Sequence, residues 1–268
     1  MKVSRILRHL LSLALAGLFL LPLMWMFLGS LRTPGLPPPR AMEILPANPT
    51  LANYARIFEI LPFGRYLFNS VLVALIGVTL TLVTASWAGF GMSLLGKRAR
   101  LSLLILSAFL QMVPITALWL TRFLLLAKLG ISNSRFALIA PALMGTSPLF
   151  ILLFYWTFRR TDRAIFETAE LDGASLFQVW WRIALPLARP ALMAVTMLSF
   201  LFYWNDFITP LIYLHSQTLY TLPIGLAQLQ DMDKTNWPLL MAASVVMTVP
   251  AVAVFSFLQR SLLWWDSE

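Results

Sequence analysis

Acidic side chains are concentrated in one short stretch of this otherwise basic chain. Four of the chain's 11 acidic residues fall between positions 159 and 188: Asp162, Glu167, Glu170 and Asp172. The formal charge of the whole chain is +9, so this local excess of carboxylates is unusual. Carboxylates on a protruding helix can form charge-assisted hydrogen bonds with a basic partner. The pattern therefore predicts a docking surface for another protein in the 159–188 loop.

The rest of the sequence gives little evidence for a catalytic or metal-binding site. The chain has no Cys, and its two His residues, His9 and His215, are too far apart to suggest a local metal motif. The segment from Gly91 to Lys97 resembles a phosphate-binding loop, but Arg98 stands where Ser or Thr would hold Mg²⁺. We therefore predict no catalytic residue, no metal site, no cofactor bound by this chain and no ATP hydrolysis by the chain itself.

The composition indicates which elements must position the acidic loop. The chain is 59% hydrophobic and 12% charged, whereas soluble proteins carry about 25% charged residues. About 20 apolar residues cross a bilayer as a helix, and long continuous runs favour helices over a membrane barrel. The predicted fold is all-α, a polytopic membrane protein with six transmembrane helices. They are expected near 9–30, 67–94, 102–127, 136–158, 189–213 and 238–260.

The distribution of basic residues predicts how these spans are oriented. With the N-terminus inside, 12 of the 20 Lys and Arg residues fall on the inner side and eight on the outer side. Basic residues in short loops weigh most in the positive-inside rule, and the turn 97–100 holds three of them. Both termini and the 159–188 loop are therefore predicted to be cytoplasmic. A basic charge in such a protein fits anionic lipid rather than nucleic acid.

Three regions follow from this topology. The first helix and an extracytoplasmic loop occupy residues 1–64, the core of five helices and the 159–188 loop occupies 65–260, and a cytoplasmic tail occupies 261–268.

The 159–188 loop itself is predicted to form two short helices joined by a glycine. Thr161 or Asp162 can cap the first helix, and Gly173 falls where a residue after the helix must take a positive φ. Ser175 and Gln178 have the spacing of a capping box that begins the second helix, and Pro186 is expected to end it. Five apolar side chains would form an exposed face: Phe166, Ala169, Phe177, Val179 and Trp180. The alternative is an interfacial segment that only packs on the helix bundle.

The sequence places one carboxylate, Asp206, inside a predicted span. Intramembrane carboxylates usually face the bundle interior or a water-filled path. Its neighbours Trp204 and Asn205 could stack on and hydrogen-bond a solute, which makes these three residues candidates for a solute path. The alternatives are a structural hydrogen bond from Asp206 to a neighbouring helix and a role for Trp204 as an interface anchor.

The spacing within the 159–188 loop resembles a known motif. Glu167-Thr168-Ala169 is followed after three residues by Gly173, and after nine more by Ile183-Ala184-Leu185-Pro186. This pattern resembles the "EAA" loop of ABC-transporter permeases, which reads E-A-A, three residues, G, nine residues, I-x-L-P. The one departure is Thr168 in place of Ala, and its side chain is small enough to fit.

Further matches along nearly the whole chain are similar to the sugar branch of these permeases, the maltose-type second membrane subunit. They are Pro49-Thr50-Leu51-Ala52-Asn53-Tyr54, Asn69-Ser70, Met112-Val113-Pro114, Leu171-Asp172-Gly173-Ala174 and Trp204-Asn205-Asp206-Phe207. A peptide or amino-acid permease would share the loop but is expected to lack the last of these motifs.

The resemblance implies a transmembrane subunit of a binding-protein-dependent importer for a sugar or related polyol, in a bacterial or archaeal inner membrane. In such permeases the loop docks on a cytoplasmic ATPase, so Glu167 would meet a basic group and Gly173 would give the bend. The loop residues Thr168, Ala169, Asp172, Ile183, Leu185 and Pro186 belong to the same motif. The implied partners are that ATPase, which binds ATP and Mg, a second permease and an extracytoplasmic binding protein.

Other functions remain as alternatives. The solute could be glycerol-phosphate or another non-sugar molecule. A secondary carrier is expected to show paired half-sequence repeats and several ionisable groups near the bilayer midplane, and neither is apparent. A membrane-embedded hydrolase would need paired carboxylates or a Ser-His pair within the spans, and these are also not apparent.

Overall fold

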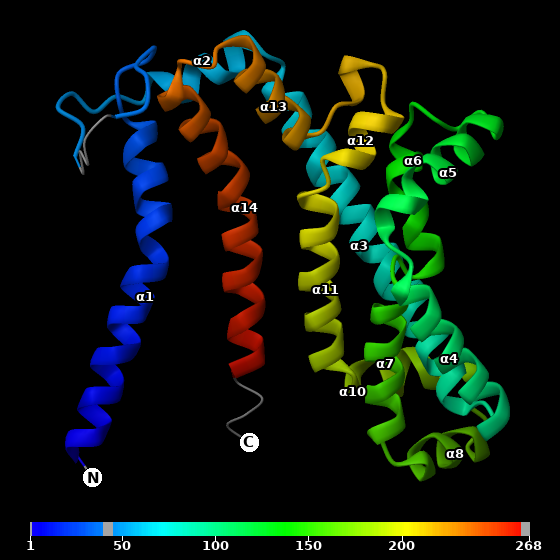
Figure 1. Ribbon diagram of the computed structural model, residues 1–268. Helices are drawn as coiled ribbons and strands as arrows, with labels where there is room; N and C mark the ends of the chain where they lie inside the picture. Colours follow the sequence, from blue (N-terminus) through cyan, green and yellow to red (C-terminus); the bar gives the residue numbers. More distant parts are fainter. Residues whose placement is uncertain (1, 40–44, 264–268) are drawn as a thin grey trace. The chain divides into compact units, whose positions relative to one another are not determined.

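The computed structural model describes residues 2–39 and 45–263, and every regular element in those ranges is a helix (Figure 1). The long apolar runs explain this, because a helix satisfies all its backbone hydrogen bonds without help from solvent or a neighbouring segment. The predicted all-α fold is therefore confirmed. Arg40, which the topology assigns to the outer side, and residues 264–268 of the predicted tail lie outside the described residues.

Four of the described segments are continuous enough to cross a bilayer alone, and they match four predicted spans within a few residues. They are His9–Ser30 of α1 (Lys2–Ser30), α3 (Phe63–Leu94), Arg135–Arg160, and Trp237–Gln259 of α14 (Trp237–Leu263). The third of these comprises α6 (Arg135–Ile139), the 3-10 turn η1 (Ala140–Met144) and α7 (Pro148–Arg160). Two bent helix pairs bring the number to six if each pair counts as one span.

The third predicted span, 102–127, is not one straight helix. It consists of α4 (Lys97–Met112) and α5 (Ile115–Lys128), which meet at an angle of 94°. Pro114 has no amide to donate, and its ring forces the preceding residue out of the helical region. Val113 accordingly has an extended ψ of 119°. The proline therefore ends one helix and begins the next.

The prediction of a continuous fifth span over 189–213 is wrong. The helix α11 (Arg189–Trp204) ends before Asp206, and α12 (Ile208–Tyr213) begins after it. Pro210 cannot donate to the carbonyl of Asp206, four residues earlier, and the Asp206 side chain instead accepts a hydrogen bond from the Thr209 amide at 3.1 Å. The helical segment that forms a bent pair with α11 precedes it in the chain: Leu176–Leu187 meets α11 at an angle of 84°.

The chain forms two compact units built from separate segments. Unit 1 contains residues 1–64 and 222–250, and unit 2 contains residues 65–221 and 251–268. In contrast, the regions predicted as 1–64, 65–260 and 261–268 follow the order of the chain.

Unit 1 joins α1, α2 (Ala52–Ile60), α13 (Leu222–Met232) and the start of α14. The buried Asn53 side chain donates to the carbonyls of Ser30 and Arg32 at 2.9 and 2.7 Å, which ties α2 to the end of α1. The Gly35 amide donates to the side chain of Asn236 at 3.0 Å. Buried amides of this kind replace the backbone bonds that are lost where helices end.

Unit 2 packs α3 closely against α7. A Cβ atom on Gly89 would lie 2.8 Å from Cβ of Phe154 and 2.9 Å from the backbone oxygen of Ile151. Small residues allow helix backbones to approach in this way within a membrane. The core beside this crossing is largely aromatic, with Phe90, Phe154 and Phe158 all buried.

Candidate functional site

The first helix of the 159–188 loop is α8 (Arg163–Leu171), and it lies at the end of unit 2 where α4 begins (Figure 1). The Asp162 side chain accepts a hydrogen bond from the Ala164 amide at 3.0 Å, so Asp162 is the cap. Thr161, the other candidate, donates instead to the carbonyl of Thr157. An acidic cap also interacts favourably with the positive end of the helix dipole.

The predicted glycine turn follows α8 directly. Gly173 has φ +87°, and its amide donates to the carbonyl of Glu170 at 3.0 Å. The amide of Ala174 donates to the carbonyl of Ala169 at 3.0 Å, which completes a Schellman motif. Nothing lies within 4 Å of a Cβ built on Gly173, so the backbone conformation alone favours glycine here.

The second helix begins as predicted and ends differently. Ser175 and Gln178 form the capping box, and the Ser175 amide donates to Gln178 Oε1 at 2.8 Å. The helix runs through α9 (Leu176–Val179), the π-helical turn η2 (Trp180–Ala184) and α10 (Leu185–Leu187). The prediction that Pro186 ends it is therefore wrong, since Leu187 is still helical. A wider π turn lies before Pro186, and its Leu185 amide donates to the carbonyl of Trp180. Pro186, the next residue, has no amide to donate.

The apolar face predicted for this loop is mostly occupied within the chain. Phe166, Val179 and Trp180 are buried and belong to the core of unit 2. The ring of Phe166 contacts Phe90 edge to face at 5.6 Å. Ala169, Ile183 and Leu185 are partly buried against the same core, whereas Phe177 remains exposed. The loop is therefore anchored to the bundle on one side.

The opposite side of α8 is free of such packing and carries the acidic residues. Glu167, Thr168, Glu170, Asp172 and Gly173 are all exposed. Arg163 Nε lies 2.8 Å from Glu167 Oε1, so the predicted docking carboxylate has a partner within its own helix. This pair is well exposed, and exposed pairs one helical turn apart contribute only about 0.3–0.5 kcal/mol. A basic group on a partner could therefore replace Arg163 at little cost.

A further residue of this surface, Leu171, was named from the sequence only within a family motif and was not predicted to be part of the docking surface. Leu171 ends α8 and is 88% exposed. It is flanked by Glu170 and Asp172, so it presents an isolated apolar side chain within an acidic surface. Its position next to the glycine turn was the available signal, because a residue at the tip of a hairpin has few intrachain neighbours. We call Glu167, Glu170, Leu171 and Asp172 the acidic surface.

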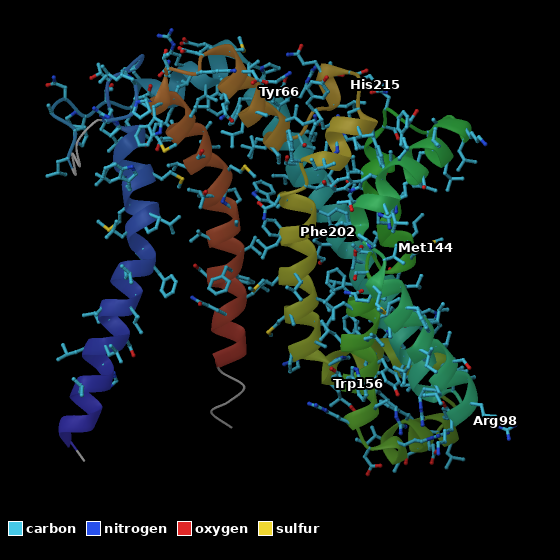
Figure 2. The ribbon with its side chains drawn as sticks, in the orientation of Figure 1. Tyr66, Arg98, Met144, Trp156, Phe202 and His215 are labelled. Carbon is cyan, nitrogen blue, oxygen red and sulfur yellow. The ribbon has the colours of Figure 1, made fainter. Side chains whose placement is uncertain are left out.

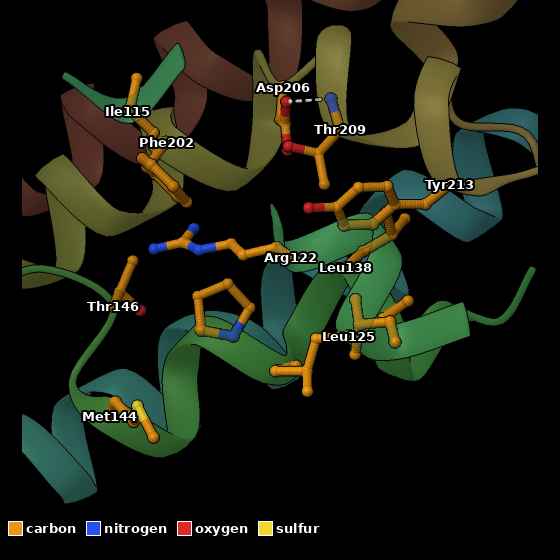
Figure 3. A pocket seen from close by; sticks show the side chains of 14 residues that line it. Ile115, Arg122, Leu125, Leu138, Met144, Thr146, Phe202, Asp206, Thr209 and Tyr213 are labelled. Carbon is orange, nitrogen blue, oxygen red and sulfur yellow. Dashed lines mark hydrogen bonds between the residues drawn. The ribbon is translucent and has the colours of Figure 1, made fainter. Parts of the chain in front are cut away.

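The second candidate site is a cavity of about 210 Å³ in unit 2, which includes Asp206. Figure 3 shows Arg122 of α5 pointing into it, with Phe202, Thr146 and Tyr213 on its walls and Asp206 bonded to Thr209. Arg122 also lines a larger adjoining cavity of about 650 Å³. The sequence reasoning missed Arg122, although its charge directly follows the apolar run 101–121.

Of the three predicted solute-path residues, only Asn205 and Asp206 line a common cavity. Trp204 is only 1% exposed and stacks on Phe200 with ring centroids 5.4 Å apart. Its ring is therefore used within the fold and is not presented to a solute. Asn205 is exposed and shares a shallow cavity with Asp206. Of the three residues, only Asp206 lines the cavity that contains Arg122.

One wall of this cavity has an unusual backbone. Thr146 has φ +61°, a region that β-branched residues rarely adopt. Its hydroxyl lies 2.7 Å from the hydroxyl of Tyr203 and also hydrogen-bonds Thr81. Such strain persists only where the surroundings enforce it, and it is found mainly at functional sites. Among the described residues, no group of three or more His, Asp and Glu side chains could hold a metal ion.

Comparison with known proteins gives consistent matches over nearly the full length. The family model of binding-protein-dependent transport system inner membrane components matches residues 77–263. The arabinooligosaccharides transport system permease protein AraQ of Bacillus subtilis (strain 168) is 31% identical over 261 residues, covering 96% of this chain and 92% of the relative. The trehalose/maltose transport system permease protein MalG of Thermococcus litoralis is 31% identical over 265 residues, covering 97% and 94%.

Among solved structures, the fold is similar to a chain in the crystal structure of a bacterial ABC transporter involved in the import of the acidic polysaccharide alginate. The TM-score is 0.76 with 21% sequence identity, over 97% of this chain and 96% of that chain. A second match is the alginate transporter in complex with an alginate pentasaccharide-bound periplasmic protein, with a TM-score of 0.67 and 12% identity over 96% and 94%. At these identities the similarity concerns the fold.

Proposed function

The chain belongs to the family of binding-protein-dependent transport system inner membrane components, and from this premise we propose that it is the sugar-translocating permease subunit of an ABC importer. The observation that carries the proposal is the exposed acidic surface of α8. The opposite side of the same helix is anchored to the core of unit 2 by the buried Phe166. The membrane spans supply the path, and a separate subunit supplies the energy.

The acidic surface is suited to bind a cytoplasmic ATPase. Glu167, Glu170 and Asp172 offer carboxylates to basic groups, and Leu171 offers an apolar side chain to a pocket. Hydrogen bonds between a carboxylate and a basic group are roughly twice as strong as those between neutral groups. ATP and Mg belong to that partner in this proposal, because Arg98 replaces the Mg-binding residue of the one phosphate-loop-like segment.

The connection between α8 and the bundle explains how docking could move the membrane helices. The Schellman turn at Gly173 and the capping box at Ser175 fix the angle between the two short helices. Phe166 packs on Phe90 of α3, and Phe90 packs on Phe158 of α7. A displacement of α8 would therefore be transmitted to two membrane helices through closely packed aromatic rings.

The names of the relatives support the solute class that we propose. The two permeases compared above serve transport systems for arabinooligosaccharides and for trehalose and maltose. A neutral sugar or a short oligosaccharide is the solute class we assign to this chain. The proposed complex also contains a second permease, because this chain offers one docking loop, and an extracytoplasmic binding protein that delivers the sugar.

We place the acidic surface and both termini on the cytoplasmic side of the inner membrane. Figure 2 shows Arg98 and His215 at opposite ends of unit 2. The three basic residues of the turn 97–100 favour the cytoplasm for the end that contains Arg98. Reporter fusions at Arg163 and Gln217 should therefore report opposite sides, and a shared side would contradict this topology.

The docking proposal is tested by reversing one charge. In the complex with its ATPase, Glu167→Lys should abolish sugar uptake while the membrane subunit is still inserted at the parental level. Arg163→Gln is the matched control, since it removes the same intrahelical ion pair but keeps the carboxylate. It should retain uptake.

Rescue would identify the partner group directly. A compensating basic-to-acidic substitution in the ATPase cleft should restore uptake to Glu167→Lys. If Glu167→Lys transports normally, the loop only packs on the bundle and the proposal fails at this step. Purified alone, the chain should hydrolyse no ATP, and measurable hydrolysis would also contradict it.

A further inference from the structure

We infer that the cavity between Arg122 and Asp206 is a contact site for one ring of a neutral saccharide on the translocation path, with Arg122 donating hydrogen bonds and Asp206 accepting them. This inference rests on the proposed function and adds a site and a ligand class to it. The two charged residues come from different elements, α5 and the segment between α11 and α12.

Arg122 is the first reason to assign a ligand. Its side chain is half-buried and lines both the 210 Å³ cavity and the adjoining 650 Å³ cavity. It forms no ion pair or hydrogen bond within the described part of the chain. A partly desolvated guanidinium without acceptors is unfavourable. A solute that supplies oxygen acceptors would remove that penalty.

Asp206 supplies the complementary half of the site. The Thr209 amide donates to its Oδ1 at 3.1 Å, which fixes the carboxylate on the cavity wall. It is not ion-paired with Arg122, although both line the same space (Figure 3). Two opposite charges held apart in one cavity are a poor surface for an apolar partner helix. They are a good surface for a ligand that bridges them.

The chemistry of the lining selects a neutral polyhydroxylated ligand. A sugar hydroxyl can accept from Arg122 and another can donate to Asp206, whereas an anionic group attracted by Arg122 would be repelled by Asp206. The rings of Phe202 and Tyr213 provide apolar walls for the C–H faces of a sugar. The cavity of about 210 Å³ has room for one sugar ring beside Arg122 and Asp206.

The backbone of Thr146 is an independent indication that this wall is functional. Its positive φ is held by hydroxyl contacts from α3 and α11, through Thr81 and Tyr203. Thr146 lines both cavities beside Arg122. The fold therefore keeps an unfavourable local conformation at the point where the smaller cavity meets the larger one.

The test uses the complete transporter, with its ATPase, second permease and binding protein, reconstituted in liposomes. The probe is a neutral saccharide that the binding protein carries, supplied at a saturating concentration of loaded binding protein. Arg122→Met should lower the initial uptake rate about 10- to 100-fold, the loss expected for hydrogen bonds to a charged group. Arg122→Gln, which keeps donors, should lose less.

Lys128→Gln is the matched control. Lys128 lies on the same helix, is exposed and does not line either cavity, so this variant should transport at the parental rate. ATP hydrolysis stimulated by the loaded binding protein should be retained in Arg122→Met, because the acidic surface is untouched. Asp206→Asn should lose less uptake than Asp206→Leu, which removes the acceptor as well.

A double variant separates a shared ligand from two unrelated effects. If Arg122 and Asp206 contact the same ring, Arg122→Met combined with Asp206→Leu should lose less than the product of the single losses. Equal uptake by Arg122→Met and Lys128→Gln would overturn the inference and leave the proposed function intact. Failure of all Arg122 variants to co-purify with the second permease would also overturn it, since the cavity would then be a subunit contact.

The wild-type complex decides the ligand class and the function separately. Uptake of acidic saccharides but not neutral ones would overturn the inference of a neutral ligand. It would leave the proposed importer function intact. No uptake of any saccharide by the assembled wild-type complex would overturn the sugar assignment of the proposed function as well.

Discussion

The hydroxyl of Thr146 lies 2.7 Å from the hydroxyl of Tyr203, which joins the turn before α7 to α11. Thr146 also hydrogen-bonds Thr81 of α3, so one residue in the left-handed backbone region connects three parts of unit 2. These polar contacts lie beside the cavity that contains Arg122. The shape of that cavity therefore depends on a small number of hydroxyl groups.

Tyr203→Phe should weaken this connection without changing the packed volume. The net loss of one hydrogen bond is about 0.5–1.5 kcal/mol. We expect a decrease of about 2–4 °C in the thermal unfolding midpoint of the purified complex. Tyr155→Phe is the control, because Tyr155 is equally buried and its hydroxyl has no hydrogen-bond partner in the described chain. Equal midpoints for the two variants would contradict the role of Tyr203.

Gly89→Ala should separate α3 from α7. The added Cβ would lie 2.8 Å from Cβ of Phe154 and 2.9 Å from two backbone atoms, which cannot rotate away. Overpacking of this kind costs about 1–3 kcal/mol or more, and we expect a lower yield of monodisperse protein in size-exclusion chromatography. Gly91→Ala, two residues further along α3, has nothing within 4 Å and should behave as the parent.

The backbone conformation of Gly173 should decide which residues can replace it. At φ +87° with open space around Cβ, Asn should be best accepted, Ala less well and Pro not at all. Ala in the left-handed region costs roughly 1–2 kcal/mol, so Gly173→Ala should reduce coupled uptake partly. Gly173→Pro should abolish uptake while insertion into the membrane is retained. Full uptake with Gly173→Pro would show that the angle between the two short helices is not used.

Asp233 should make the connection between α13 and α14 sensitive to acid. Hydrogen bonds from the hydroxyl of Thr235 at 2.7 Å, and from the amides of Thr235 and Asn236, hold the pKa of Asp233 below its ordinary value of 3.8. A lowered folded-state pKa gives stability that is present above 3.8 and is lost as the pH falls through the lower value. Amide exchange over residues 233–237, corrected for intrinsic rates, should therefore accelerate in that range.

Substitution distinguishes this titration from general acid unfolding. Asp233→Asn keeps an acceptor oxygen but cannot titrate, so the acid-dependent step should disappear. Asp231→Asn, a matched change on α13, should retain it. If both variants keep the step, another group is responsible.

Much of the local structure was predictable because its causes are local. The apolar runs determine where helices form, since a backbone in hydrocarbon must satisfy its own hydrogen bonds. The signals in the 159–188 loop act on residues within one helical turn. The structure confirms the cap at Asp162, the positive φ at Gly173 and the capping box of Ser175 and Gln178. Where local signals compete, as at Pro186 shortly after a π turn, the prediction of the helix end was wrong.

The sequence by itself determined the helical membrane fold, its family motif and the ends of α8, because each of these depends on composition or on neighbours in the chain. Only the tertiary structure decided that Trp204 is buried and that Arg122 shares a cavity with Asp206. The bend at Pro114 carries α5 away from the line of α4, and Arg122 with it. Which side chains then meet depends on the simultaneous packing of several helices, and no periodicity within one helix contains that information.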